Sequence, residues 1–159
     1  GATWVWNNLI TDTHHGIVDT GSGTHTLTVQ NNIVTDLNSG ENGAHLYIEN
    51  SDIANGAPLD HNLYFQPGLP MSVKLGSSTA ITTPDDLPSN AHSSLNEDPQ
   101  CTLPAQDQYE PLSGSPVGDA GVDIGAALQA ALGVVLDMDY NGDPRESGSA
   151  WDMGPWEIQ

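Results

Sequence analysis

A recurring asparagine motif constrains the fold of this chain more than any other feature. Each copy contains one or two polar residues, then an Asn, then two or three apolar residues. The copies are Trp6–Ile10, Gln30–Val34 and Asp60–Tyr64. Their asparagines are separated by 24 and then by 30 residues. A repeat of this length, with strand-like rather than helical sequence between the copies, is typical of a β-solenoid.

The asparagines Asn8, Asn32 and Asn62 are placed where such a chain must turn from one face to the next. A sharp turn often needs a positive φ, which Asn tolerates better than most residues. Its amide side chain can also bond to the turns above and below. We therefore predict that the three asparagines form a structural ladder and take no part in catalysis.

Residues 3–80 carry the pattern of short strands separated by turns. Thr24–Val29 alternates polar and apolar residues with a period of two, as a half-buried strand does. Ile53 is a candidate start of a further strand. The connections contain turn residues instead of helical periodicity, which excludes a doubly wound α/β fold and favours parallel strands wound into a coil. The predicted fold is all-β, with about three rungs within residues 3–80.

The sequence changes character from about residue 81. Residues 81–159 are predicted to form a long irregular tail that packs along the rungs and caps them. We expect one short helix in this tail, over 123–133, with Asp123 as its cap, Leu128 on its apolar face and Gly133 at its end. The chain length suits one domain, and we predict a single domain over residues 1–159.

The charge of the chain limits its partners. It has 21 Asp and Glu residues against Lys74 and Arg145, a formal net charge of −19. Such a chain repels nucleic acids and anionic membranes, so we expect neither as a partner. No apolar run approaches the roughly 18 residues of a membrane span, so we expect no membrane insertion. High ambient salt, bound Ca²⁺ or cationic partners would each offset the self-repulsion.

The composition favours an extracellular protein, because Asn, Gly, Thr and Ser are abundant and Lys is nearly absent. Cys101 is the only cysteine, so no disulfide within the chain is possible. The start, Gly1–Trp4, has neither a Met nor a charged leader. We therefore expect a processed product or an excised segment.

Four motifs follow one another in the later part of the chain. They are Asn96–Pro99, Tyr109–Gly121, Asp137–Arg145 and Trp151–Glu157. In this order they resemble the C-terminal end of secreted right-handed parallel β-helix proteins of the pectate-lyase-like superfamily, which commonly runs DP…L…SPxxDxG…D…G.PR…DxGxxE. With the asparagine motifs, the resemblance covers nearly the whole chain. It implies a right-handed parallel β-helix and leaves the function open, because that superfamily includes lyases, hydrolases, adhesins and structural surface proteins.

The resemblance also implies further rungs upstream of the first one. The first rung would expose an edge of unpaired backbone groups together with tryptophan side chains. Either an upstream segment or another copy of the chain would cover such an edge, and a head-to-tail contact that does not close gives a filament. Aromatic residues are favoured at buried contacts, with core filling as the alternative. The candidate interface residues are Trp4, Trp6, Trp151 and Trp156.

One acidic run is a candidate Ca²⁺ site. It offers oxygen ligands at alternate positions and a Gly at the sixth, as a Ca²⁺ loop does at its start. The candidate ligands are Asp137, Asp139, Asn141 and Asp143. The twelfth position is Gly148 instead of a bidentate Glu. The alternative is a structural turn in which Arg145 pairs with neighbouring carboxylates. Ca²⁺ is the one cofactor that the sequence suggests.

No catalytic residues are assigned. Acidic pairs such as Asp85–Asp86 arise easily by chance among 21 acids and do not by themselves indicate a glycosidase. A lyase acting on an acidic polymer would need a basic residue, and Lys74 and Arg145 are the only two. His15 and His45 are expected to stack as neutral rings rather than to bind a transition metal. Cys101 is expected to be a small buried side chain and no nucleophile.

Two functional hypotheses follow. The first is an extracellular structural β-solenoid that is no enzyme and self-associates head to tail into a filament or surface layer. The second is the C-terminal part of a secreted β-helix enzyme that binds or degrades polysaccharide, with glycans as partners. The tryptophans near both ends and the poverty of basic residues favour the first.

Overall fold

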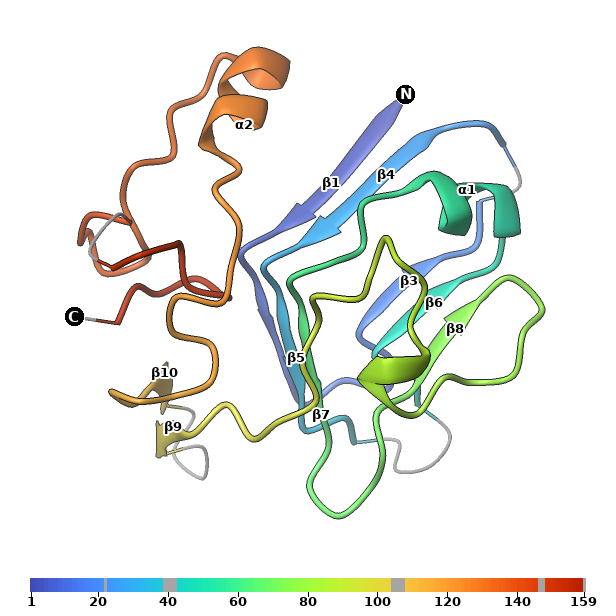
Figure 1. Cartoon of the computed structure of the whole chain (residues 1–159), viewed down its shortest axis with the longest axis horizontal. Coiled ribbons are helices and arrows are strands. Elements are labelled where there is room, and N and C mark those ends of the chain that lie inside the picture. The colour runs from blue at the N-terminus through green and yellow to red at the C-terminus, as the bar shows by residue number, and fades with distance from the viewer. Residues whose placement is uncertain (22, 39–42, 104–107, 146–147, 159) are drawn as a thin grey trace.

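The fold is rich in β-strands and contains few helices, as the sequence predicts. The structure, a computed structural model, describes residues 1–21, 23–38, 43–103, 108–145 and 148–158. Within it the chain passes three times along the same path, and we call each pass a level. Strands of successive levels lie side by side (Figure 1).

The strands of the three levels pair in parallel. Level one (residues 2–19) contains β1 (Ala2–Trp6), β2 (Leu9–Ile10) and β3 (Ile17–Asp19). Level two (residues 26–48) contains β4 (Thr26–Gln30), β5 (Ile33–Thr35) and β6 (Leu46–Ile48). Level three (residues 58–75) contains β7 (Leu63–Phe65) and β8 (Val73–Leu75). The resulting sheets are β1–β4, β2–β5–β7 and β3–β6–β8, with no antiparallel pair among them.

The sheet β2–β5–β7 is buried on both faces. Successive residues of a strand point to opposite sides. Val34 and Tyr64 therefore face the interior between the sheets, where the main core lies. Ile33 and Leu63 face the other way and pack against the tail at Met153 and its neighbours. This two-sided burial explains why the motif residues after each Asn are a continuous apolar run instead of an alternating one.

One predicted strand is a helix. Ile53 lies in α1 (Ser51–Gly56) rather than at the start of a strand. The side chain of Asn50 accepts hydrogen bonds from the N–H groups of Asp52 and Ile53, at 2.9 and 3.4 Å, and so caps the helix. The prediction was wrong because this cap outweighs the strand propensity of a single isoleucine.

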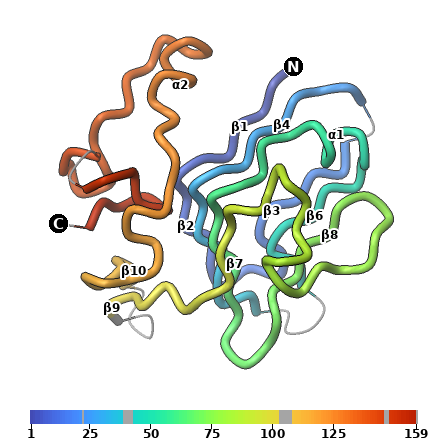
Figure 2. Tube along the Cα trace, viewed as in Figure 1, coloured from blue at the N-terminus to red at the C-terminus, as the bar shows by residue number. Residues whose placement is uncertain are grey.

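The tail lies along one side of the levels, next to the sheet that contains β2 and β7 (Figure 2). Within residues 81–159 it begins with a short 3-10 turn, η2 (Pro84–Asp86), and contains the antiparallel pair β9 (Cys101–Leu103) and β10 (Gln108–Pro111) and the helix α2 (Gly125–Leu132). The prediction of one short helix in the tail is confirmed. No helix in the described ranges is long and apolar enough to cross a membrane.

The ends of α2 differ in part from the prediction. Gly133 ends the helix with a φ of 68°, as predicted. The capping position is Ile124 instead of Asp123, although Asp123 does accept a hydrogen bond from the N–H of Gly125 at 2.7 Å. Leu128, on the predicted apolar face, is buried, whereas Leu132 at the end of the helix is 53% exposed. The helix stands away from the strands (Figure 1), so most of its apolar surface stays uncovered.

Candidate functional site

The three motif asparagines lie above one another and are joined through their side chains. The backbone N–H and the Nδ2 of Asn8 both donate to Oδ1 of Asn32, at 3.1 and 2.9 Å. Asn32 donates in the same way to Oδ1 of Asn62, at 3.0 and 2.9 Å. We place level one at the top of the stack and level three at the bottom. Each ladder Asn that has a ladder Asn below it thus donates two hydrogen bonds to the level below, and its Oδ1 is the acceptor for the level above. Asn32 and Asn62 are fully buried, whereas Asn8 is exposed.

The left-handed backbone at this corner lies one position before each ladder residue. The φ values are 51° at Asn7, 57° at Asn31 and 54° at His61. The expectation that the ladder asparagines themselves have positive φ is therefore wrong. The preceding residue makes the turn, and the ladder residue that follows directs its amide along the stack.

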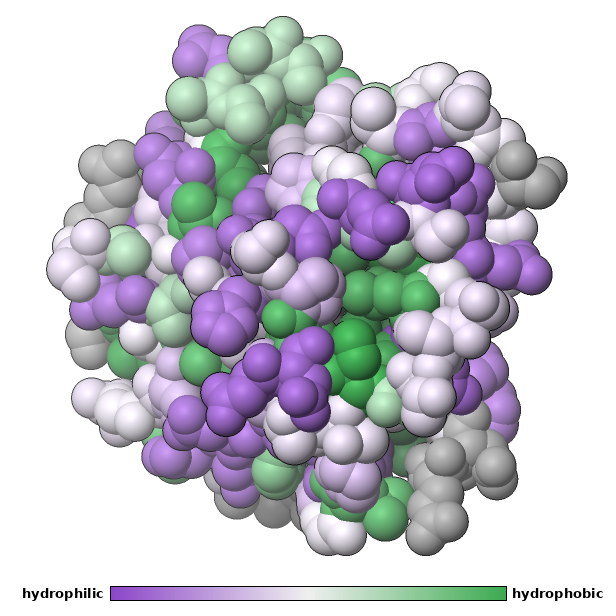
Figure 3. Space-filling model, turned by 45° about the vertical axis from the view of Figure 1, so that its right-hand side comes forward, coloured by the Kyte–Doolittle hydropathy of each residue, from purple (hydrophilic) through white to green (hydrophobic). Residues whose placement is uncertain are grey.

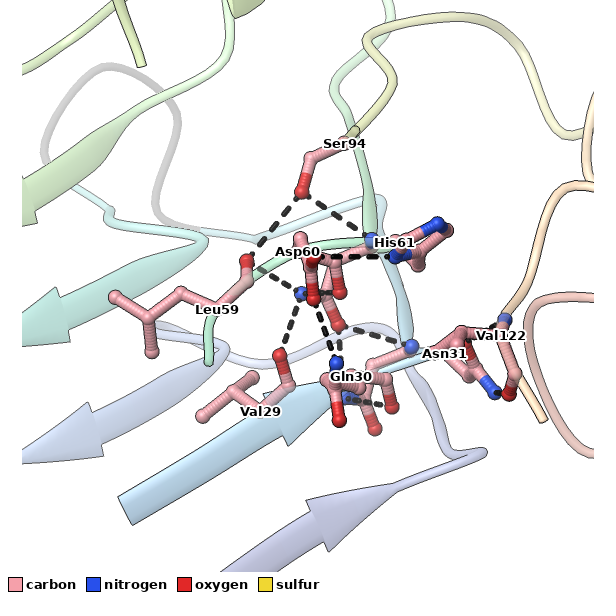
Figure 4. A network of polar contacts seen from close by, with 10 residues as sticks. Val29, Gln30, Asn31, Leu59, Asp60, His61, Ser94 and Val122 are labelled. Atoms are coloured by element: carbon pink, nitrogen blue, oxygen red, sulfur yellow. Dashed lines mark hydrogen bonds and ion pairs between the residues drawn. The ribbon is translucent and has the colours of Figure 1, made fainter. Parts of the chain in front are cut away.

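Ser94 continues the ladder by one step that the sequence did not reveal. The N–H of Asn62 donates to Oγ of Ser94 at 3.2 Å, and this hydroxyl donates to the carbonyl of Leu59 at 3.4 Å. Figure 4 shows the Ser94 hydroxyl between these two groups. Ser94 is buried and stands where an Asn would be expected. Because Ser replaces Asn at this position, the asparagine motif is not visible in the sequence here.

A backbone ladder runs beside the side-chain ladder. The N–H of the aliphatic residue after each ladder position donates to the ladder carbonyl of the level above. These bonds join Ile33 to Asn8 at 2.8 Å, Leu63 to Asn32 at 2.8 Å and Leu95 to Asn62 at 2.7 Å. Leu95 also forms a parallel bridge with Leu63. Ser94 and Leu95 are therefore a partial fourth level.

The chain itself covers the lower end of the stack. We call each set of segments that stack from level to level, along β1–β4, β2–β5–β7 and β3–β6–β8, a column. Residues 81–95 form backbone hydrogen bonds with level three in all three columns. The pairs are Val73 with Ile81, Tyr64 with Leu95 and Leu59 with Asn90, at 2.8 to 3.0 Å. We call this the covered end. The N–H and C=O of Val73 and the N–H groups of Tyr64 and Leu59 are thereby paired within the chain.

The opposite end differs, because the strands of level one have a neighbour on one side only. Among the described residues, β1 pairs with β4, β2 with β5 and β3 with β6, and none of the three has a second partner. We call the outer side of β1, β2 and β3, together with Asn8, the open edge. Unpaired strand edges are where further strands add.

Hydrogen bonding shows which backbone groups of β1 face outward. The carbonyl of Gly1 accepts from Thr26 and the N–H of Asn7 donates to Gln30, at 3.1 and 3.3 Å, so the odd-numbered residues face level two. Backbone groups alternate in direction along a strand. The N–H groups of the even-numbered residues Ala2, Trp4 and Trp6 therefore point away from the stack.

Level one is also less completely satisfied than level two. Within the described part of the chain, Nε1 of Trp6, both side-chain amide atoms of Asn7 and Oγ1 of Thr11 are buried without a hydrogen-bond partner at level one, against Oγ1 of Thr35 and Nε2 of His45 at level two. At level two the counterpart of Asn7 is Asn31, which donates to the carbonyl of Val122 at 2.7 Å and accepts from its N–H at 2.9 Å. Figure 4 shows this two-point contact between Asn31 and the tail.

The four candidate interface tryptophans have different surroundings. Trp4 and Trp6 are half-buried neighbours at the open edge, with ring centroids 5.7 Å apart. Trp156 is half-buried and packs against Tyr140 at 6.1 Å. Trp151 is only 5% exposed and lies 5.5 Å from the guanidinium of Arg145. Trp151 is therefore a core residue of the tail and unsuited to an interface.

The candidate Ca²⁺ run folds into a closed turn. Oδ1 of Asp139 accepts from the N–H groups of Asn141 and Asp143, both at 2.8 Å, and its Oδ2 accepts from the N–H of Glu157 at 2.9 Å. Asn141 donates its Nδ2 to Glu110 at 3.1 Å. These oxygens are directed at backbone amides rather than at a common point. In the described ranges no group of three or more His, Cys, Asp or Glu residues could hold a metal ion.

Arg145 holds the end of the tail in place from within. It is 4% exposed and donates to the carbonyls of Met138 and Pro155, both at 3.1 Å. Burial lowers the pKa of Arg145, and the nearby carboxylates of Glu157, Asp139 and Asp152 oppose that shift. Opposite charges so near keep a buried guanidinium protonated. The acidic motif residues of the tail therefore have structural partners.

The histidines form a second ladder, although not by stacking ring on ring. Nδ1 of His15 accepts from the N–H of Ala44 at 3.1 Å, and Nδ1 of His45 accepts from the N–H of Ser72 at 3.0 Å. Each imidazole thus accepts from the backbone of the level below. Burial lowers the pKa of both rings, with His14 and Lys74 adding to the shift at His15. Neutral rings suit this accepting role.

One hollow with acidic residues in its lining does not follow from the sequence. A cavity of about 190 Å³ is lined by residues that include Asp36, Asp98, Cys101 and Tyr109. Burial and the nearby Asp98 raise the pKa of Asp36. Burial, followed by Asp98 and Asp36, raises the pKa of Cys101 to about 11, so its thiol is protonated and a poor nucleophile at neutral pH. This arrangement does not identify a catalytic centre.

Another surface feature is apolar. Exposed Leu132, Val134, Val135 and Met138 gather around the end of α2. Figure 3 shows a pale green, weakly apolar cluster at the top of the molecule and deep green apolar side chains near the centre of a face that is otherwise mostly hydrophilic. A second hollow of about 380 Å³ between β4 and α1 is lined in part by Thr24, Thr26 and Thr28. Binding of a glycan at such a surface stays a prediction.

No protein-family model matches the chain, and no curated protein or solved structure is significantly similar to it. The resemblance to the pectate-lyase-like superfamily, the extracellular location and the single-domain assignment therefore stay predictions. The open edge and its asparagine corner are the features on which a functional proposal can be built.

Proposed function

We propose that this chain is the capped end of a right-handed parallel β-helix and acts as a structural module outside the cell. Its levels are coils of that helix. The covered end and the tail close the coil against further strands, and the open edge binds one more coil of parallel strands.

The single observation that carries this proposal is the contrast between the two ends of one stack. Three columns of level three are paired with residues 81–95. The same three columns at level one have no outer partner among the described residues. Natural proteins block strand edges that are meant to stay unpaired, with charges, prolines or covering segments. Ala2–Trp6 has none of these, and its half-buried tryptophans suit a surface that becomes buried.

The remaining chemistry favours a structural role over an enzymatic one. The acidic motif residues of the tail accept hydrogen bonds from the backbone, as Asp119 does from Ser149 and Ala150 at 2.6 and 3.0 Å. Those hydrogen bonds lower the pKa of Asp119. The net charge of −19 and the polar exposed faces suit an extracellular protein.

A second candidate is self-association of two copies, and the adjacent Trp4 and Trp6 at the open edge favour it. The covered end disfavours the head-to-tail filament, because such a filament needs a free strand edge at both ends of each copy. Two open edges facing each other would instead give a closed dimer. Size-exclusion chromatography with light scattering, at neutral pH and in salt, separates monomer, dimer and filament.

The proposal is tested by offering the open edge a strand. A labelled synthetic peptide of residues 24–35, which spans β4 and β5, should bind the intact chain as an added coil. Trp4→Pro removes an outward N–H as well as the indole, whereas Trp4→Ala removes the indole alone. We expect Trp4→Pro to weaken peptide binding clearly more than Trp4→Ala. Absence of peptide binding to the native chain would overturn the proposal.

A further inference from the structure

Every complete step of the asparagine ladder contains the same four contacts. The upper Asn donates its N–H and its Nδ2 to Oδ1 of the lower Asn. The aliphatic residue after the lower Asn donates its N–H to the carbonyl of the upper Asn. The lower Asn donates its own Nδ2 to the carbonyl three residues before the upper Asn. That carbonyl belongs to Val5 in the first step and to Val29 in the second, both at 2.8 Å.

Level one presents the lower half of another such step. Oδ1 of Asn8 is the position at which two donors arrive in the steps below, and no donor reaches it within the described ranges. The N–H of Leu9 is the counterpart of the N–H groups of Ile33 and Leu63, both of which bond to the level above. Nδ2 of Asn8 is the counterpart of the group that reaches Val5 from Asn32. It already donates to Oδ1 of Asn32 and to the carbonyl of Trp6, and Asn32 reaches Val5 in addition to the same two kinds of acceptor. Asn8 and Leu9 therefore offer a defined pattern of one acceptor and two donors.

We propose that Asn8 and Leu9 recognise a specific strand sequence, an Asn followed by an aliphatic residue on an incoming parallel coil. The inference rests on the proposed function, and it names the partner of the open edge. The partner is an extended polypeptide segment whose Asn amide donates to Oδ1 of Asn8. Its Asn carbonyl accepts from Leu9, and the carbonyl three residues earlier accepts from Nδ2 of Asn8.

The chemistry of the four contacts gives the order of preference at the recognised position. The backbone N–H comes with every residue except Pro, so the side chain decides: an Asn amide has two hydrogens, one for Oδ1 of Asn8 and one for a carbonyl of its own level, as Asn32 uses towards Asn62 and Gln30. A Ser supplies a single side-chain donor, and Ala supplies none. An Asp has no Nδ2 and would place a negative charge against Oδ1 of Asn8 on a chain that already carries a net charge of −19. Asn should therefore be preferred over Ser, and Ser over Ala and Asp.

The chain supplies its own probe for this recognition. The peptide of residues 24–35 contains Asn32 and Ile33, and in the register of β1 with β4 its Val29 would lie over Val5 and its Asn32 over Asn8. Fluorescence anisotropy of the labelled peptide is measured against the intact chain. The comparison uses the parent peptide, an Asn32→Ala peptide and a Thr28→Ala peptide as the matched control outside the ladder.

We expect the Asn32→Ala peptide to bind about tenfold more weakly than the parent, as for the loss of one or two hydrogen bonds of ordinary strength. The Thr28→Ala peptide should bind within about twofold of the parent. On an Asn8→Ala chain, the parent and Asn32→Ala peptides should bind equally, because a double-mutant cycle isolates their contact. Asn8 is exposed, so this variant should stay folded, and its circular dichroism checks that.

The outcomes separate this inference from the proposed function. Equal binding of the parent and Asn32→Ala peptides to the native chain overturns the sequence recognition and leaves the strand-binding edge standing. A preference for Asn that persists on the Asn8→Ala chain also overturns the recognition by Asn8. Binding of no peptide overturns the proposed function and the inference together.

Discussion

The two ends of the stack are made of the same parts and differ in how those parts are completed. At the covered end, Asn62 is fully buried and its side chain reaches carbonyls of its own level and of the level above. At the open edge, Asn8 is exposed and has Asn32 and the carbonyl of Trp6 as its described partners. The comparison teaches that the repeat alone does not determine the role of a ladder position. The segment that covers it does.

The largest contrast is expected from the same substitution at the two ends. Asn62→Ala leaves two donors of Asn32 and several backbone groups unpaired in the interior and should cost about 3–4 kcal/mol of unfolding free energy. Asn8→Ala should cost less than about 1 kcal/mol, because the deleted side chain is exposed and Oδ1 of Asn32 still accepts from the backbone N–H of residue 8. Urea denaturation of both variants measures the difference. Equal losses would show that the open edge is as enclosed as the covered end.

The next contrast lies within β1. Val5→Pro removes an N–H that faces level two, and it should lower the unfolding free energy by about 2–3 kcal/mol. Trp4→Pro removes an N–H that faces outward. Its backbone cost is the difference in unfolding free energy between Trp4→Pro and Trp4→Ala, and this difference should be at least about 1 kcal/mol smaller than the cost of Val5→Pro. Thermal and urea unfolding of the three variants test this. A greater backbone cost at Trp4 would reverse the assigned direction of the strand.

A smaller contrast concerns pH. Burial lowers the pKa of His45 at level two, so the unfolded chain binds a proton more readily than the folded one as the pH falls below about 6.5. The unfolding free energy contributed by the neutral His45 ring is therefore fully present above that pH and is lost on acidification towards pH 5. His45→Gln should flatten this part of the stability curve, and His15→Gln should flatten it less because His15 is exposed. Identical slopes for both variants would remove the distinction between the levels.

The smallest effect is expected from cations. A chain with a net charge of −19 should gain a few degrees in melting temperature when salt screens its self-repulsion. Ca²⁺ at matched ionic strength should add nothing to this, because the oxygens of Asp139 are already occupied by backbone amides. Differential scanning fluorimetry in chelator, in NaCl and in millimolar CaCl₂ compares the three conditions. A gain specific to Ca²⁺ would restore the metal site.

Much of the fold could be predicted because its signals are local. The spacing of the three asparagines indicates strands in register, and the turn residues between them exclude helical crossovers. Gly133 ends α2 through its own backbone freedom. Each of these features depends on one or two residues and their immediate neighbours.

The features that escaped prediction depend on contacts between segments far apart in sequence. Ser94 takes the place of a ladder Asn because residues 81–95 fold back under level three. Trp151 is buried because Arg145 lies against it, so the sequence alone could not separate it from Trp4 as an interface residue. Positive φ occurs at Asn7, Asn31 and His61 because one residue makes the turn and the next one forms the ladder, which the motif alone does not reveal.

Hydrogen exchange resolved at single amides gives the most direct test of an edge that binds a coil. In the chain alone, the N–H groups of Trp4 and Leu9 should exchange fast, and those of Ile33 and Leu63 should exchange slowly. Saturating peptide of residues 24–35 should slow exchange at Trp4 and Leu9 at least about tenfold and leave Leu95 unchanged. Protection of Trp4 and Leu9 that is already complete without the peptide, or that stays the same with it, would overturn the strand-binding role.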